Sequence, residues 1–140
     1  RATRWDAVPD YLHNAHTELC LIVQVESRLG SDNVAEIAAV EGVDAVFVGP
    51  ADLSSGLGHA GNPGHPEVQA RIRAAIDATR AAGKAAGILA PQEDDARRYR
   101  DWGCQFVAVG IDISLFRRAA LTNLARYRPL DAPQAPSRTY

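Results

Sequence analysis

The segment "DAVFVGPADLSSGLGHAG", residues 44–61, joins a short apolar run to a polar, glycine-rich loop. The run "DAVFVG" (44–49) is rich in branched residues and predicts a β-strand that ends at a turn. The loop allows two interpretations. Residues 56–61 have the G-x-G-x-x-G spacing of a dinucleotide-binding fingerprint, whereas Asp52 places a carboxylate just beyond the strand. The remainder of the chain has to distinguish a phosphate-binding loop from a metal ligand followed by a turn.

Strand and helix patterns alternate along the whole chain. The predicted strands cover residues 19–26, 44–49, 85–90 and 105–111, and the predicted helices cover 29–40, 65–83, 93–103 and 113–127. Such alternation predicts parallel strands joined by right-handed crossovers. Two α/β architectures fit, an open doubly wound sheet or part of a (β/α)₈ TIM barrel, and 140 residues supply only half of the roughly 250 that a full barrel needs.

Apolar positions at helical spacing predict which side chains are buried. In the helix 65–83, which has Pro66 in its first turn and ends at Gly83, these positions are Val68, Ile72, Ala75, Ile76 and Thr79. In the closing helix the predicted buried stripe is Leu115, Ala119 and Leu124. We also expect Cys20 and Cys104 to be reduced and buried, and Trp5 and Trp102 to pack against the core.

Composition limits the class of protein. A net charge of −2 and 46% hydrophobic residues describe one soluble domain, with no basic surface for nucleic acid and no membrane partner. Two reduced, buried cysteines are typical of a cytoplasmic protein. Because they form no CxxC pair and have no matching histidine spacing, we do not expect a zinc site. We predict a domain over residues 1–128 and a disordered, proline-rich tail over 129–140. The chain begins at Arg1 and has no methionine, so we expect processing or a longer parent.

The glycine fingerprint does not have the context of a dinucleotide site. Its first glycine should follow the strand at once and its third should open the helix. Here "PADLSS" precedes Gly56 and "NPG" follows Gly61, and Asp77 lies within a predicted helix rather than at the end of the next strand. The glycines therefore indicate a turn beside a β-α unit.

Polar side chains in the first strand break its aliphatic pattern. Gln24 and Glu26 share one face near the carboxyl end of the strand, and Asp52 follows the next strand. An ionised carboxylate is retained in such a place when it is paired or binds a metal. Adjacent strands lie about 4.8 Å apart, so two such carboxylates can approach one hard cation such as Mg²⁺ or Mn²⁺. A helix cap or an arginine partner for Asp52 is the alternative that the sequence leaves open.

The histidines and the two adjacent serines do not form a recognisable catalytic pattern. His13 and His16 lie on an amphipathic stretch at 9–19, and His59 and His65 flank the glycine turn. We interpret all four as surface or hydrogen-bonding residues rather than general bases. Ser54 and Ser55 lack the strand-turn-helix context of a nucleophile elbow, which argues against acyl transfer.

Four segments together resemble the HpcH/HpaI aldolase family, which comprises class II metal-dependent pyruvate aldolases of the 4-hydroxy-2-oxoheptanedioate aldolase type. They are "LIVQVES" (21–27), "VEGVDAVFVGPADLSSGLGHAGNPGHPEV" (40–68), "GKAAGILA" (83–90) and "FVAVGIDISLF" (106–116). The similarity runs from about residue 1 to 126. The resemblance implies a (β/α)₈ barrel of which this chain supplies strands five to eight, the C-terminal half.

The resemblance also implies site residues and a cofactor. Glu26 and Asp52 would be the metal ligands, with Mg²⁺ or Mn²⁺ expected and Co²⁺ as a further option. Gln24 and the backbone amide of Ala51 would contact the pyruvate part of a small 2-oxo acid, and Leu89 would lie near the aldehyde. The chemistry expected is cleavage of 4-hydroxy-2-oxo acids to pyruvate and an aldehyde, with Lewis-acid assistance and without a Schiff-base lysine.

The chain departs from the family in its catalytic residues. The general-base histidine, its acidic partner and the arginine that holds the keto oxygen belong to the N-terminal half of the family, and no residue here matches them. We therefore expect no catalytic residue in this chain, and either a homo-oligomer or a missing N-terminal half. Two alternatives are a carbon–carbon lyase resembling citrate lyase or malyl-CoA lyase, and a non-catalytic half-barrel that acts as an assembly partner.

Overall fold

The computed structural model of the chain describes residues 3–5 and 7–127. The tail predicted over 129–140 lies outside the described residues. The strands are β1 (Ile22–Val25), β2 (Ala45–Val48), β3 (Ala85–Leu89) and β4 (Phe106–Ala108). The helices are α1 (Tyr11–Glu18), α2 (Arg28–Asp32), α3 (Val34–Ala39), α4 (Pro50–Gly56), α5 (Pro66–Ala81), α6 (Glu93–Asp101) and α7 (Asp112–Ala125).

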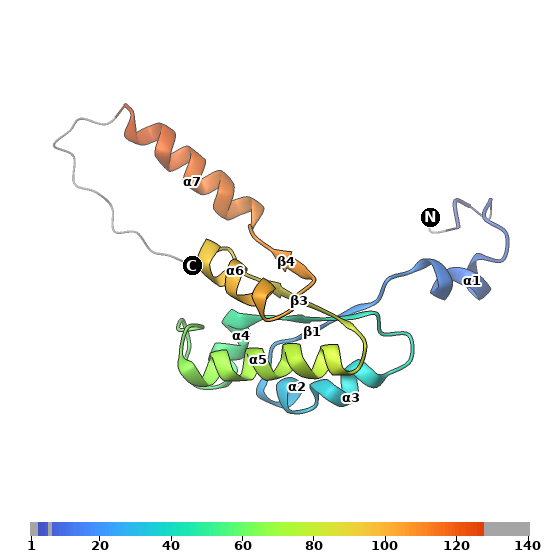
Figure 1. The fold of residues 1–140 in the computed structure, drawn as a ribbon. Coiled ribbons are helices and arrows are strands. Elements are labelled where there is room, and N and C mark those ends of the chain that lie inside the picture. Colours follow the sequence, from blue (N-terminus) through green and yellow to red (C-terminus); the bar gives the residue numbers. More distant parts are fainter. Residues whose placement is uncertain (1–2, 6, 128–140) are drawn as a thin grey trace.

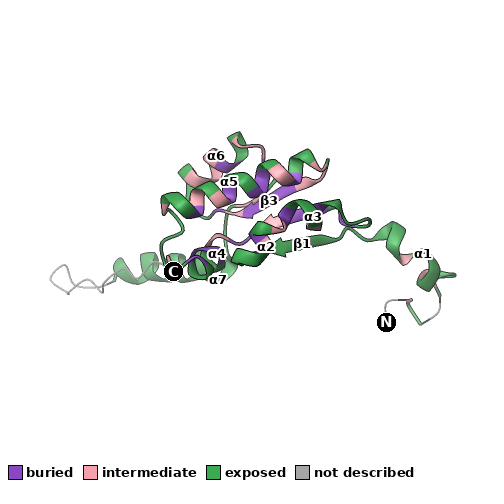
Figure 2. Ribbon diagram, turned by 90° about the horizontal axis from the view of Figure 1, so that it is seen from below, coloured by how far each residue is buried: buried purple, intermediate pink, exposed green. Residues whose placement is uncertain are grey.

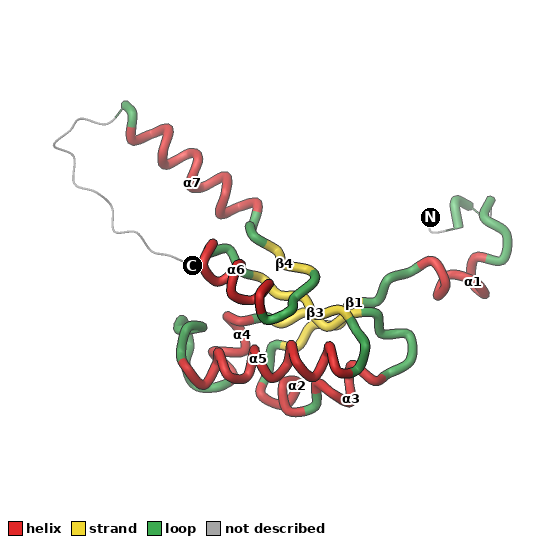
Figure 3. The backbone as a smooth tube through the Cα atoms, viewed as in Figure 1, coloured by secondary structure: helices red, strands yellow, loops and turns green. Residues whose placement is uncertain are grey.

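The four strands form one parallel sheet in the order β1-β2-β3-β4. Helices α2, α3 and α5 lie together on one face of the sheet, as Figures 1 and 3 show. A doubly wound sheet needs helices on both faces, whereas barrel strands follow one another in chain order with helices only outside. The arrangement is that of half a (β/α)₈ barrel, which decides between the two architectures that the sequence allowed.

The helix-covered face of the sheet, called here the outer face, holds the hydrophobic core. Val46, Val48 and Ile88 point into it and are at most 1% exposed. All five residues predicted as the buried face of α5 are buried, and Figure 2 shows the buried residues gathered between α5, α3 and β3. The helix begins where predicted, with Pro66 at its first position and the His65 side chain accepting a hydrogen bond from the Glu67 amide. The core prediction is confirmed for this helix.

The opposite face, called here the inner face, has no helix against it among the described residues. Strand register places Gln24, Phe47, Gly87 and Phe106 side by side across all four strands. Gly87 is required at this level, because a Cβ there would meet Phe47 Cδ2 at 2.7 Å and the Phe106 carbonyl at 3.1 Å. The two phenylalanine rings meet across it, with centroids 5.5 Å apart. Phe106 nevertheless remains 49% exposed.

The closing helix differs from the prediction. Leu115, Ala119 and Leu124 were expected to be buried, but every residue of α7 is exposed. Figure 1 shows α7 extending away from the sheet after β4, and Figure 2 shows it in the colour of exposed residues. A helical apolar stripe is buried only where another element covers it, and within the described residues none covers this one.

Two further burial predictions are wrong for a similar reason. Cys20 is exposed, although Cys104 is buried as expected. Trp5 is 83% exposed, whereas Trp102 packs against the core. Cys20 and Trp5 both precede β1, where the chain runs away from the sheet toward α1, as Figure 1 shows. Apolar character predicts burial only for segments that the sheet and its helices enclose.

Element boundaries also differ in detail. The helix predicted over 29–40 is divided at Asn33 into α2 and α3, and the Ser27 hydroxyl caps α2 by accepting from the Gly30 amide at 3.0 Å. Polar Ser, Asp and Asn residues compete with the helical backbone for hydrogen bonds, which accounts for the interruption. Strand β4 has three residues, fewer than predicted.

Candidate functional site

Gln24 and Glu26 lie at the carboxyl end of β1 and lean over the neighbouring strand. The Gln24 Nε2 atom donates a hydrogen bond to Glu26 Oε2. A Cβ added at Gly49 would meet Glu26 Cβ at 2.9 Å, Gln24 Nε2 at 3.0 Å and Glu26 Oε2 at 3.1 Å. Gly49 follows β2 and its amide continues the ladder by donating to the Val25 carbonyl at 3.0 Å. The absence of a side chain at Gly49 therefore creates the space that the amide and carboxylate occupy.

Asp52 and Ala51 lie in the first turn of α4, directly after β2. Helix α4 begins with Pro50, and its Leu53 amide donates to the Gly49 carbonyl at 3.0 Å. The Ala51 amide, in the first turn, has no acceptor within the helix. The Asp52 side chain caps neither α4 nor any other helix and pairs with no arginine in the part of the chain that the structure describes. It is exposed to solvent. The capping and ion-pairing alternatives for Asp52 therefore have no support here.

Leu89 ends β3 and is half-buried. Because Val25 pairs with Val48 and Val48 with Ile88, the next residue on each strand brings Glu26, Gly49 and Leu89 to one level of the sheet. Lys84 lies at the opposite edge, immediately before β3. The strands thus bring Gln24, Glu26 and Leu89 together at the carboxyl edge, next to the turn that holds Ala51 and Asp52, and they keep the lysine away from it.

The glycine-rich loop is a turn, as the sequence context indicated. Helix α4 separates β2 from the first of the three glycines, because Gly56 is its last residue. Gly58 and Gly61 have positive φ angles of 88° and 74°, a backbone conformation that glycine adopts without steric cost. Neither glycine opens a helix, so the loop does not have the geometry of a pyrophosphate site.

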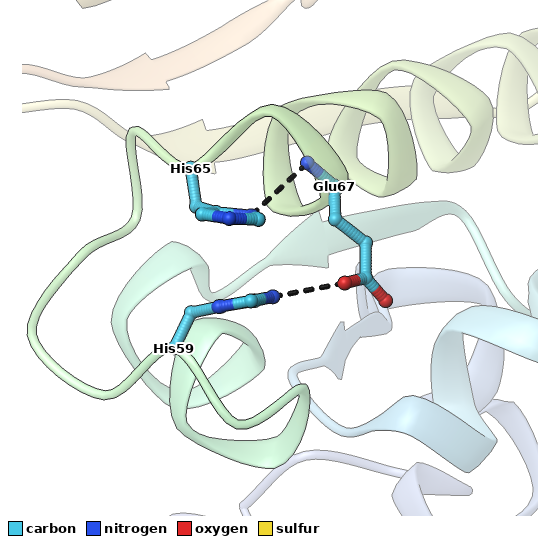
Figure 4. Close-up of side chains that lie close together, drawn as sticks. All are labelled: His59, His65 and Glu67. Carbon is cyan, nitrogen blue, oxygen red and sulfur yellow. Dashed lines mark hydrogen bonds and ion pairs between the residues drawn. The ribbon is translucent and has the colours of Figure 1, made fainter.

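His59 from this turn meets His65 and Glu67 at the start of α5, and Figure 4 shows the cluster that the three side chains form. The two imidazole rings are stacked with centroids 3.5 Å apart, and His59 Nε2 lies 2.8 Å from Glu67 Oε2. This hydrogen bond is the main cause that lowers the pKa of Glu67 below its usual value. The interpretation of both histidines as hydrogen-bonding residues is confirmed.

Sequence reasoning treated these two histidines separately and did not predict their meeting with Glu67. The available signal was the H-x₅-H-x-E spacing across a loop with two glycines. That spacing shows only that the three side chains flank one turn. Their convergence depends on the way the turn folds back against α5.

The fold and the polar carboxyl edge define half of an α/β-barrel protein, and the family model for "HpcH/HpaI aldolase/citrate lyase" matches residues 3–119. The chain belongs to this family. The resemblance seen in the sequence is therefore confirmed, as is the fold class.

The chain is similar to curated relatives named for aldolase activity. It is 68% identical to a hydroxypyruvate/pyruvate aldolase from Delftia acidovorans, over 100% of this chain and 53% of that protein. It is 54% identical to a 4-hydroxy-2-oxo-heptane-1,7-dioate aldolase from Salmonella paratyphi C, over 91% of this chain and 48% of that protein. The chain thus spans about half the length of the curated relatives that it matches.

A solved structure gives the same result for the fold. An HpcH/HpaI aldolase/citrate lyase family protein from Burkholderia cenocepacia superposes with a TM-score of 0.85 at 42% identity, over 92% of this chain and 50% of that one.

In the described residues, none of the helices combines the length and apolar character needed to cross a membrane.

Proposed function

We propose that this chain is the metal-binding half of a divalent-metal-dependent aldolase that cleaves 4-hydroxy-2-oxo acids to pyruvate and an aldehyde. The main supporting observation is the placement of Gln24 and Glu26 over Gly49, beside the strand that leads to Asp52. Family membership and the names of the aldolase relatives support the reaction class. The substrate class agrees with those names, which denote enzymes of small oxo acids.

The residues at this edge suit a hard divalent cation. Glu26 and Asp52 offer carboxylate oxygens, which Mg²⁺ and Mn²⁺ prefer, and Co²⁺ accepts the same donors. The space above Gly49 is filled by the Glu26 side chain, and neither carboxylate is neutralised by a basic side chain among the described residues. In such a site the bound ion would supply Lewis-acid stabilisation of the negative charge that develops on the keto oxygen of the substrate.

The protein groups have separate roles in this proposal. Glu26 and Asp52 would hold the ion, and Gln24 would orient the carboxylate end of the pyruvate moiety while its hydrogen bond fixes Glu26. The Ala51 amide, which has no acceptor within α4, would donate to a substrate oxygen. Leu89 would provide an apolar wall on the aldehyde side.

We infer that proton transfer uses residues outside this chain. The inner face is open, with Ile22 42% exposed and Phe106 49% exposed, and a sheet with two free edges invites pairing. We propose that strands from another polypeptide segment close this face and supply the base and the arginine.

Half-barrel complementation tests this function. The chain would be co-expressed with the part of the Delftia relative that it does not cover, purified as a complex and assayed with Mn²⁺. We expect release of pyruvate from a 4-hydroxy-2-oxo acid and exchange of the pyruvate methyl protons with solvent deuterium, followed by NMR. Glu26→Gln and Asp52→Asn should each abolish both signals, because each removes one anionic ligand.

A matched control is Glu41→Gln, which neutralises an exposed carboxylate that precedes β2 at the other edge of the sheet. Its activity should equal that of the unmodified complex. If Glu26→Gln and Asp52→Asn retain Mn²⁺ affinity and proton exchange, the aldolase proposal is wrong. Cleavage of acyl-CoA esters without pyruvate release would instead favour the lyase alternative.

A further inference from the structure

The cluster of His59, His65 and Glu67 has no role in the proposed aldolase chemistry. Its potential ligand atoms all lie within 4.8 Å of one another. The two histidines are half-buried and the Glu67 carboxylate is exposed, so the cluster can be reached from solvent. Figure 4 shows both imidazoles and the carboxylate directed to the same side of the loop.

We propose that His59, His65 and Glu67 form a site for a borderline transition-metal ion, such as Zn²⁺, Co²⁺ or Ni²⁺, that is separate from the carboxylates at the sheet edge. Two imidazole nitrogens and one carboxylate oxygen are donors that these ions favour, whereas Mg²⁺ prefers oxygen ligands alone. The ligands come from the loop after α4 and the first turn of α5, not from the strand ends. The inference does not depend on the aldolase function.

The backbone of the loop is fixed before any ion binds. The His59 amide donates to the Ser54 carbonyl at 2.7 Å, the Asn62 amide donates to the His59 carbonyl at 2.9 Å, and the His65 amide donates to the Asn62 carbonyl at 3.1 Å. The Gln69 side chain anchors the loop to α5 by donating to the Pro63 carbonyl at 2.8 Å. Preorganised ligands lose little conformational entropy on binding, so side-chain rotation is the main adjustment required.

The ion must reorganise the side chains in one respect. The imidazole planes are 16° from parallel, and an ion bound in the plane of one stacked ring cannot also lie in the plane of the other. One ring therefore has to rotate. We assign this movement to His59, because His65 also accepts the Glu67 amide as the cap of α5. The ion then replaces the hydrogen bond between His59 and Glu67.

The local charges are compatible with a cation. The pKa of Glu67 is lowered, chiefly by its hydrogen bond to His59, so its carboxylate is ionised at neutral pH. Arg28, whose guanidinium donates to the Leu57 carbonyl at 3.5 Å, also acts on Glu67 and offsets part of the attraction.

Titration of the full chain with Co²⁺ or Zn²⁺ in excess Mg²⁺ tests the site. The chain would carry Cys20→Ser, because Cys20 is exposed and a free thiol can also bind these ions. We expect one equivalent of Co²⁺ to bind with a visible spectrum that lacks a thiolate charge-transfer band. Loss of a group that merely supports a ligand typically weakens metal affinity about 10- to 100-fold, and we expect at least that for His59→Ala, His65→Asn and Glu67→Gln.

Controls distinguish this site from other ligands. Asn at position 65 can still cap α5, so weaker binding by that variant reports the missing imidazole rather than a damaged helix. His13→Ala with His16→Ala removes the two histidines of α1 and should leave binding unchanged. Unchanged Co²⁺ affinity in the His59, His65 and Glu67 variants, or no binding by the unmodified cluster, would overturn the proposal.

Discussion

The two faces of the sheet differ although the same strands build both. On β3, Ile88 faces α5 and is fully buried, while its neighbour Leu89 faces the inner side and is only half-buried. On the outer face every strand lies against helices, and on the inner face aromatic and polar side chains remain partly exposed. The outer face is covered by helices, whereas no helix covers the inner face among the described residues. The main buried core and the polar carboxyl edge of β1 therefore lie on opposite faces of the sheet.

Ile88 and Leu89 are adjacent on β3 and have side chains of equal size, and their replacement should give the largest difference in the free energy of unfolding. Ile88→Ala leaves a cavity in a closed core and should lower the free energy of unfolding by about 2–5 kcal/mol. Leu89→Ala, next to it on the open face, should cost about 1 kcal/mol. Urea denaturation of both variants measures the difference. Equal losses would mean that the inner face is as closely packed as the outer one.

The two cysteines compare the exposed segment before β1, which holds Cys20, with the enclosed core, which holds Cys104. Burial raises the pKa of the Cys104 thiol from 9.0 to about 11, while Cys20 is exposed. A thiol reagent at pH 8 should label Cys20 alone, and Cys104 only after unfolding. Mass spectrometry of the labelled peptides identifies the site. Rapid labelling of Cys104 in the folded chain would contradict its burial.

The same shift predicts a pH dependence of stability. Burial favours the protonated thiol, so the folded state holds the Cys104 proton more tightly than the unfolded state. The resulting contribution to the free energy of unfolding is complete below pH 9 and is lost as the pH rises through about 11. The loss should reach at most about 2 kcal/mol after allowance for solvent screening. Cys104→Ala provides the reference, because its unfolding free energy lacks this contribution.

The aromatic pair across Gly87 tests how much the inner face contributes by itself. A double-mutant cycle with Phe47→Leu and Phe106→Leu should give a coupling energy of about 0.5–1.5 kcal/mol, the usual range for contacting rings. The pair has centroids 5.5 Å apart and an interplanar angle of 54°. A coupling energy of zero would show that the rings do not meet while the face is open.

The smallest effect is expected in α7. Phe116 is 72% exposed, so Phe116→Ser should change the unfolding free energy by no more than about 0.5 kcal/mol. The measurement is again urea denaturation of the chain alone. A loss comparable with that of Ile88→Ala would mean that α7 packs against a core after all.

Local patterns predicted the parts of the fold that neighbouring residues control. The alternation of strands and helices, the start of α5 at Pro66 and its five buried positions follow from periodicity and from the backbone preference of proline. The assignment of Glu26 and Asp52 to one edge also follows, because parallel strands joined by crossovers end at the same side. Their role as metal ligands stays a prediction.

Other features could not be predicted because they depend on distant segments. The apolar stripe of α7 has the same periodicity as that of α5, yet one is exposed and the other buried. Periodicity states which residues of a helix share a face, but not whether another element covers that face. The same limit explains the exposure of Cys20, which lies in an apolar run outside the enclosed core.

The sequence by itself determined the order of the elements, the buried face of α5 and the two acidic positions at the carboxyl edge, since each rests on local periodicity or on strand direction. Only the tertiary structure decided that all helices against the sheet share one face, that Gly49 makes room for Gln24 and Glu26, and that His59 and His65 stack beside Glu67. The physical reason is that these features depend on distances between residues that the chain brings together only when the strands pair and the turns close.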